Sequence, residues 1–146
     1  MKIRPPILAV VCFGVAKALD LLIRSPEIIN WPLNLAGLFL ALVGLGLGVW
    51  ALRTFHRAET THDPFGTPSA LVTDGPYRFS RNPMYVGLAL VLLGAAVYSG
   101  SLVMFLAPVA FILVSNRLAI AREEKLLDGL FGRDYQDFRQ RVRRWL

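Results

Sequence analysis

The sequence predicts an all-α, polytopic membrane protein, and three observations lead to this fold class. Hydrophobic residues make up 55% of the 146 residues, and the mean hydropathy of +0.50 is too high for an ordinary soluble domain. The apolar residues gather into long runs with few charges, and the charged residues lie beside these runs. We therefore expect a single domain, residues 1–146, with about four transmembrane helices and a cytoplasmic amphipathic C-terminal helix.

The chain is basic, with a net charge of +6 and a sequence pI near 10.1. Its lysines and arginines cluster beside the apolar runs instead of along a polar surface. We therefore interpret the charge as contact with anionic lipid and expect no nucleic-acid partner. The single cysteine, Cys12, lies inside the first apolar run, which excludes an internal disulfide and a cysteine-rich metal site.

The first expected span covers residues 7–23 and is interrupted by Lys17 and Asp20, which share one helix face. An ionisable pair inside a span suggests a functional site, but a lysine reaching the interface beside its counter-ion fits equally well. The basic start and Ala16-Lys17-Ala18 also resemble a signal peptide. Because apolar residues resume after Lys17, we expect a retained span.

The second expected span, residues 33–52, carries no charge and is long enough for about 30 Å of helix. Gly44 and Gly48 form a GxxxG pair, which favours close approach of another helix. A dinucleotide-binding loop is excluded, because no strand precedes these glycines and no polar turn contains them.

A long polar connection, residues 53–82, contains both histidines of the chain. Connections of this length are usually functional or disordered. His56 and His62 have no obvious third ligand nearby, so we expect solvated or cofactor-contacting histidines and no metal site.

Two further spans, residues 84–98 and 102–121, flank a short turn and predict a transmembrane hairpin. The second of these helices is expected to continue to Leu130 and to end at Gly132. In the tail, Asp134 is a candidate cap for a last helix.

That last helix would carry an apolar stripe of Tyr135, Phe138, Val142 and Trp145, with arginines on its other face. Such a pattern is typical of a helix lying on an anionic membrane surface. Four spans also satisfy the positive-inside rule, because the side opposite the basic segments carries only Arg24. We therefore expect both termini and the site on the cytoplasmic side; the pattern leaves the oligomeric state open.

The segment around Asn82 is the expected location of the chemistry. Asn82 is a good N-cap and Pro83 a good first helical residue, so a helix should begin here. A helix start favours bound anions, and Arg78 and Arg81 add positive charge. The alternative is a basic anchor at the cytoplasmic end of a transmembrane helix.

These residues resemble the small integral-membrane methyltransferases, which include isoprenylcysteine carboxyl methyltransferases and phospholipid N-methyltransferases. In that family an Arg-His-Pro-x-Tyr-x-Gly motif begins one helix and a Glu-Glu pair follows the next. Here they read Arg81-Asn82-Pro83-Met84-Tyr85-Val86-Gly87 and Glu123-Glu124. Gly75-Pro76-Tyr77-Arg78 and Phe131-Gly132-Arg133-Asp134-Tyr135 also match, so the resemblance covers about residues 53–146.

The resemblance implies that the site binds S-adenosylmethionine. The residues that it implies for cofactor binding are Arg81, Asn82, Pro83, Tyr85, Gly87 and Glu124. Either glutamate of the pair could bind the ammonium group, while Arg81 and the helix start could bind the carboxylate. Asn82 replaces the family's histidine and cannot titrate, which leaves it a positioning role. Without the resemblance, Glu123 and Glu124 would be solvated charges neutralised by Arg122 and Lys125.

The implied activity is methyl transfer to a lipid or another membrane-partitioned small molecule with a carboxylate, amine or thiol acceptor. Glu123 is the candidate base for a protonated amine, and Arg122 could hold an anionic acceptor. Two other functions stay open at this point. One is a membrane reductase that uses a nicotinamide cofactor, and the other is a non-enzymatic membrane interaction protein.

Overall fold

The computed structural model describes residues 4–58 and 70–146, and apart from one isolated bridge its secondary structure there is helical. His62 and the middle of the long polar connection lie outside these residues. In chain order the elements are α1 Pro5–Ile23, η1 Leu33–Leu35, α2 Ala36–Arg57, η2 Gly75–Arg78, α3 Pro83–Ser99, η3 Val103–Phe105, α4 Leu106–Val114, the π-helical turn η4 Ser115–Ile120, α5 Ala121–Phe131 and α6 Arg133–Arg141.

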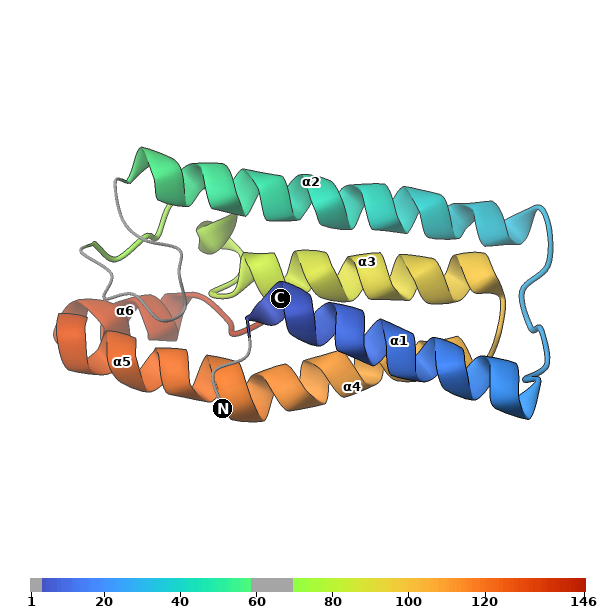
Figure 1. Cartoon of the computed structure of the whole chain (residues 1–146). Helices are drawn as coiled ribbons and strands as arrows, with labels where there is room; N and C mark the ends of the chain where they lie inside the picture. The colour runs from blue at the N-terminus through green and yellow to red at the C-terminus, as the bar shows by residue number, and fades with distance from the viewer. Residues whose placement is uncertain (1–3, 59–69) are drawn as a thin grey trace.

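Helices α1 to α4 lie side by side, with α3 in contact with the other three (Figure 1). Within the described residues, three helices are long and apolar enough to cross a membrane: Pro5–Ile23, Leu33–Arg57 and Val103–Phe131. The helix Pro83–Ser99 is apolar but shorter. The fold is therefore that of a multi-pass, all-α membrane protein, as the sequence predicts.

Glycines bring α2 and α3 into backbone contact. A Cβ atom added to Gly44 would lie 2.5 Å from the carbonyl oxygen of Gly87, and Gly37 meets Gly94 in the same way. The prediction that Gly44 is an interface glycine is confirmed. Gly48 lies at the same contact, because a Cβ atom added to Gly87 would lie 3.0 Å from the backbone nitrogen of Gly48, but a Cβ atom on Gly48 itself would meet nothing within 4 Å.

The connection between α1 and α2 is hydrogen-bonded to the turn after α3, at the end of the bundle where α1 ends. The N–H of Ile28 donates to the Gly100 carbonyl (2.8 Å), and the N–H of Leu102 donates to the Pro26 carbonyl (3.3 Å). The predicted ion pair also lies near this end: Lys17 Nζ is 3.0 Å from Asp20 Oδ2.

Asp20 is tied to the same turn through its other oxygen. The hydroxyl group of Ser101 donates to Asp20 Oδ1, so the carboxylate links α1 to the chain between α3 and η3. This contact favours a structural role for the Lys17–Asp20 pair.

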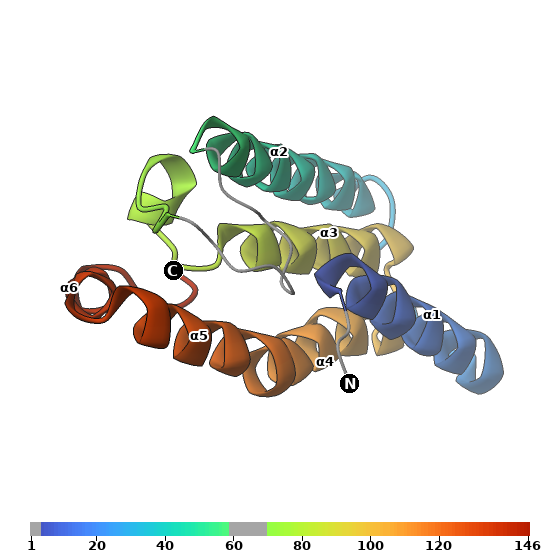
Figure 2. The ribbon, with the colours of Figure 1, turned by 60° about the vertical axis from the view of Figure 1, so that its left-hand side comes forward.

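The C-terminal part folds back on the bundle (Figure 2). Helix α5 ends at Phe131, and Gly132 follows it with a φ of +49°, which is readily accessible to glycine. Helix α6 begins at Arg133, so Gly132 occupies the N-cap position predicted for Asp134.

The apolar stripe of α6 faces the protein and not the membrane. Tyr135 and Phe138 are 1% and 4% exposed, and they form a core cluster with Ala51, Val72 and Tyr77. The prediction that this stripe lies on a membrane surface is therefore wrong. Its pattern is amphipathic because a neighbouring helix and loop cover one side of α6.

Candidate functional site

A cavity of about 680 Å³ lies at the end of the bundle where α3 begins. It is walled by the start of α1, the last turns of α2, the segment before η2, the start of α3, α5 and α6. The volume falls in the range of about 300–1,000 Å³ that is usual for small-molecule sites. Its polar lining residues are Arg4, Tyr77, Arg81, Asn82, Tyr85, Glu123, Glu124 and Tyr135.

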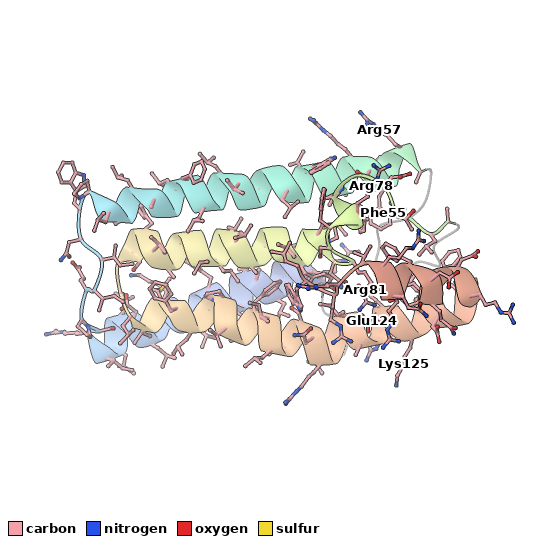
Figure 3. All side chains as sticks on the ribbon, turned by 180° about the vertical axis from the view of Figure 1, so that it is seen from behind. Phe55, Arg57, Arg78, Arg81, Glu124 and Lys125 are labelled. Carbon is pink, nitrogen blue, oxygen red and sulfur yellow. The ribbon has the colours of Figure 1, made fainter. Side chains whose placement is uncertain are left out.

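Arg81, which lies just before α3, and Glu124 of α5 meet at the wall of this cavity (Figure 3). Arg81 Nη1 lies 2.9 Å from Glu124 Oε1, and the two side chains are only 9% and 11% exposed. Glu124 is therefore not a solvated charge. Lys125, in contrast, is exposed and points away from the molecule (Figure 3).

A second arginine engages the same carboxylate. Arg144 donates from Nε to Glu124 Oε1 (3.0 Å) and from Nη2 to Oε2 (2.6 Å). Such bidentate, charge-assisted bonds fix the plane of a carboxylate as well as its position. Arg81 also donates from Nη1 to the hydroxyl oxygen of Tyr135 (3.2 Å), so Arg81 is held from two helices.

Asn82 marks the start of α3 as predicted, but its side chain does not cap the helix. It makes no side-chain cap hydrogen bond; instead Nδ2 donates to the carbonyl oxygen of Arg144 (2.9 Å). The backbone N–H of Asn82 donates to Ser80 Oγ (3.1 Å). Pro83 provides the fixed φ that begins the helix, so the local helix start is set by Pro83 and the long-range contact by Asn82.

Glu123 faces the cavity with a tyrosine as its partner. The hydroxyl group of Tyr85 donates to Glu123 Oε1 (2.7 Å), and Tyr85 is 3% exposed. None of the ion pairs in the described part of the chain involves Glu123. Its carboxylate can therefore neutralise a positively charged ligand.

Two buried donors at the site have no hydrogen-bond partner among residues 4–58 and 70–146: the Tyr77 hydroxyl and Arg81 Nε. Burial raises the pKa of Tyr77, and the negative charge of Glu123 adds to the rise, so the hydroxyl keeps its proton. An unpaired buried donor costs about 1–3 kcal/mol, which a bound acceptor would offset. The sequence motif around Arg78 includes Tyr77, but the pattern gives Tyr77 no role of its own.

Apolar side chains line the rest of the cavity. They include Leu52 and Phe55 of α2 and Met84 and Leu88 of α3. The ring of Phe55 packs edge-on against Tyr77, with 5.2 Å between ring centroids. Such a lining suits the flat, weakly polar part of a ligand.

Three of the residues predicted for the site lie outside the cavity lining. Arg122 is exposed on α5 and does not line the cavity. Pro83 and Gly87 are buried in α3 behind the lining, and Gly87 belongs to the contact with α2. The cavity thus unites Arg81, Asn82, Tyr85, Glu123 and Glu124.

Comparison with known proteins places this geometry in context. A model of the phospholipid methyltransferase family matches residues 33–134, which include both motifs. Probable protein-S-isoprenylcysteine O-methyltransferases of Oryza sativa subspecies indica and japonica are each 30% identical over 136 residues, covering 89% of this chain and 70% of theirs. An uncharacterized protein of Haemophilus influenzae is 44% identical over 63 residues, which are 43% of this chain and its own full length.

Proposed function

The chain belongs to the phospholipid methyltransferase family, and we propose that it transfers a methyl group from S-adenosylmethionine to a lipid or another membrane-partitioned small molecule. One observation carries the proposal: a single cavity joins Arg81 at the start of α3 to the glutamate pair of α5. A non-enzymatic membrane protein would not need two buried donors left unpaired beside that cavity.

The residues present fit the cofactor. S-adenosylmethionine carries a carboxylate, an ammonium group, a sulfonium and an adenine. Arg81 Nε and the Tyr77 hydroxyl are unpaired donors suited to a carboxylate, and the apolar lining is suited to the adenosyl part. Glu123 is suited to a positively charged group of the cofactor, the ammonium or the sulfonium. Because two arginines already engage Glu124, we assign it to hold Arg81 and not to bind the ammonium group directly.

When bound, S-adenosylmethionine supplies an electrophilic methyl group on a sulfonium. The chain has to bind, orient and exclude water, because a displacement of this kind needs no protein nucleophile. Tyr85 orients the Glu123 carboxylate through its hydroxyl group. For an amine acceptor, Glu123 takes the proton that the amine must lose before attack. A carboxylate or thiolate acceptor needs no base.

The acceptor is proposed only as a class. The family description names a phospholipid, and the names of the Oryza relatives specify an isoprenylcysteine, so the two point to different acceptor groups. Arg122, predicted to hold an anionic acceptor, is exposed, and the proposal does not depend on it.

We further propose four spans, with α3 as the shortest, and a cytoplasmic site and termini. The support is the positive-inside rule. Arg57 at the end of α2 and Arg78 of η2 lie at the same end of the bundle as Arg81 and Glu124 of the cavity (Figure 3). The cofactor is water-soluble. The acceptor would then reach the cavity from the bilayer, and the cofactor from the cytoplasm.

The test is calorimetric titration of the purified protein, in detergent and in lipid, with S-adenosylmethionine, S-adenosylhomocysteine and a nicotinamide cofactor. Saturable binding of the first two supports the proposal, and a screen with labelled methyl groups then identifies the acceptor. If only the nicotinamide cofactor binds, the protein is a reductase. No binding at all to folded protein would overturn the enzymatic proposal.

A further inference from the structure

Three consecutive residues after α6 bind the outside of the cavity wall. They are Arg143, Arg144 and Trp145, which we call the tail strap. None of them lines the cavity, yet each bonds to a neighbouring element. The sequence pattern places Trp145 on the stripe of the last helix, but α6 ends at Arg141 and the strap lies beyond it.

The main chain of the tail strap holds the segment before α3. The N–H of Arg81 donates to the Arg143 carbonyl (2.9 Å). The Arg144 carbonyl accepts from Asn82 Nδ2 (2.9 Å) and from Ser80 Oγ (3.3 Å). Three consecutive residues immediately before α3, residues 80–82, are therefore fixed to the tail strap.

The side chains of the tail strap reach the other wall. Arg144 makes the bidentate bond to Glu124 on α5, and Trp145 Nε1 donates to Asn116 Oδ1 (2.9 Å) in the π-helical turn η4. The tail strap thus links α3, η4 and α5. Its removal would leave Glu124 with Arg81 as its one ion-pair partner among the described residues, beside the Tyr85–Glu123 and Arg81–Tyr135 hydrogen bonds.

Glu124 can hold Arg81 in one place only if its own carboxylate is fixed. One oxygen, Oε1, accepts from both arginines, and the other, Oε2, accepts from Arg144. Without Arg144, rotation of the carboxylate would become possible and Arg81 would lose its fixed partner. Arg144 is 38% exposed, so its pairing contributes modestly to global stability.

We propose that Arg144 is a positioning residue for the cofactor site, and that docking of the tail strap and binding of the cofactor reinforce each other. This inference rests on the proposed function. Arg144 fixes Glu124, Glu124 fixes Arg81, and Arg81 presents its unpaired Nε to the ligand. Coupling between two sites is reciprocal, so a ligand that orders Arg81 also stabilises the docked tail strap.

A displaceable lid would behave in the opposite way. The cavity of about 680 Å³ is open while the tail strap is docked, so a ligand can bind without moving the strap. Binding of S-adenosylmethionine should therefore slow hydrogen exchange in residues 142–146. A lid would exchange faster when the ligand binds.

The experiment compares Arg144→Ala with Arg143→Ala, which removes the same charge one residue earlier. The Arg143 side chain is exposed, and its bond to Arg81 uses only its carbonyl group. Hydrogen exchange is measured by mass spectrometry without ligand and with S-adenosylmethionine, and affinity by calorimetry. Arg144→Lys, which keeps the charge but not the bidentate fork, is measured alongside in case Arg144→Ala does not fold.

We expect Arg144→Ala to weaken S-adenosylmethionine binding at least fivefold, Arg144→Lys to lie between it and wild type, and Arg143→Ala to stay within twofold. Hydrogen exchange of residues 78–86 should be faster in Arg144→Ala than in wild type, and it should be the same as wild type in Arg143→Ala. Three results would each overturn the inference. The first is equal affinity in Arg144→Ala, Arg144→Lys and wild type, and the second is an equal loss of affinity in Arg143→Ala and Arg144→Ala. The third is faster hydrogen exchange of the tail strap when the ligand is bound.

Failure of the proposed function can be told apart from failure of this inference. If the wild type binds no S-adenosylmethionine, the proposed function fails. The exchange of residues 78–86 without ligand still tests whether Arg144 orders the site wall. Faster exchange in Arg144→Ala alone supports that positioning role, and equal exchange in both variants contradicts it.

Discussion

Arg81 and Glu124, from the start of α3 and from α5, form an ion pair across the cavity wall, with 2.9 Å between Arg81 Nη1 and Glu124 Oε1. Both side chains are about nine-tenths buried. Removing one member of a buried pair leaves the other charge without compensation. The pair therefore both shapes the site and makes the site sensitive to substitution.

Arg81→Ala and Glu124→Gln should each weaken S-adenosylmethionine binding at least tenfold, about 1.4 kcal/mol, because each removes the contact that presents Arg81 to the cavity. Membrane insertion should be unaffected, since Arg81 precedes α3 and Glu124 lies beyond the apolar run 102–121, in the polar last part of the helix Val103–Phe131. The control is Arg78→Ala, because Arg78 is largely exposed and its ion-pair partner, Asp74, is exposed as well. Calorimetry measures the affinity, and unchanged values in both site variants would remove the assignment.

Tyr77→Phe should separate binding from stability. The hydroxyl group of Tyr77 is buried without a partner, so its loss should leave the free protein equally stable or slightly more stable. Cofactor affinity should fall about fivefold, since a hydrogen bond contributes roughly 1 kcal/mol. Tyr98→Phe, at an exposed tyrosine far along α3, is the control. A Tyr77→Phe protein that is destabilised but binds normally would show that the hydroxyl has a structural partner instead.

Asn82→His should be tolerated and Asn82→Leu should not. The Asn82 side chain donates to the Arg144 carbonyl, and a histidine ring nitrogen can also donate there, whereas leucine leaves that carbonyl with only the longer bond from Ser80 Oγ. We expect near wild-type thermal unfolding for the histidine variant and a loss of about 0.5–1.5 kcal/mol for the leucine variant, the usual contribution of one hydrogen bond. Loss of folding with histidine would mean that space, and not the hydrogen bond, decides this position.

Gly44→Ala should separate α2 from α3. The added Cβ atom would lie 2.5 Å from the Gly87 carbonyl oxygen, so one backbone has to move, at a cost of about 1–3 kcal/mol. Gly46→Ala on the same helix meets nothing within 4 Å and should be neutral or stabilising. Thermal unfolding in detergent compares the two, and similar midpoints would contradict the close contact.

Gly48→Leu should fill the cavity without disturbing the fold. A Cβ atom added at Gly48 meets no neighbour within 4 Å, and Gly48 lines the cavity. We expect normal thermal unfolding with weaker binding of ligand or acceptor, and Gly46→Leu as the control should retain binding. Normal binding with leucine at position 48 would place the ligand elsewhere in the cavity.

The helices and the two motifs could be predicted because each is local in the sequence. A run of apolar residues is visible as a span, and Asn82-Pro83 is visible as a helix start. The resemblance then named Arg81, Tyr85 and the glutamate pair, whose meeting in one cavity required only that the two helices pack together.

The missed features all depend on tertiary contacts. Arg144 looks like any basic tail residue until the fold brings it to Glu124. Gly48 and Gly44 are equivalent in a GxxxG pattern, and only the crossing of α2 and α3 distinguishes them. The stripe of α6 has the period of a surface helix, but periodicity alone does not reveal whether lipid or protein covers it.

The junction between the first connection and the turn after α3 has a further consequence, for how such a chain can change. Its bonds join main-chain atoms, from Ile28 to Gly100 and from Leu102 to Pro26. Most substitutions in the connection leave those bonds in place, whereas a one-residue insertion displaces them together. We therefore expect the connection between α1 and α2 to tolerate substitutions but not insertions or deletions. A tag or epitope is better inserted elsewhere.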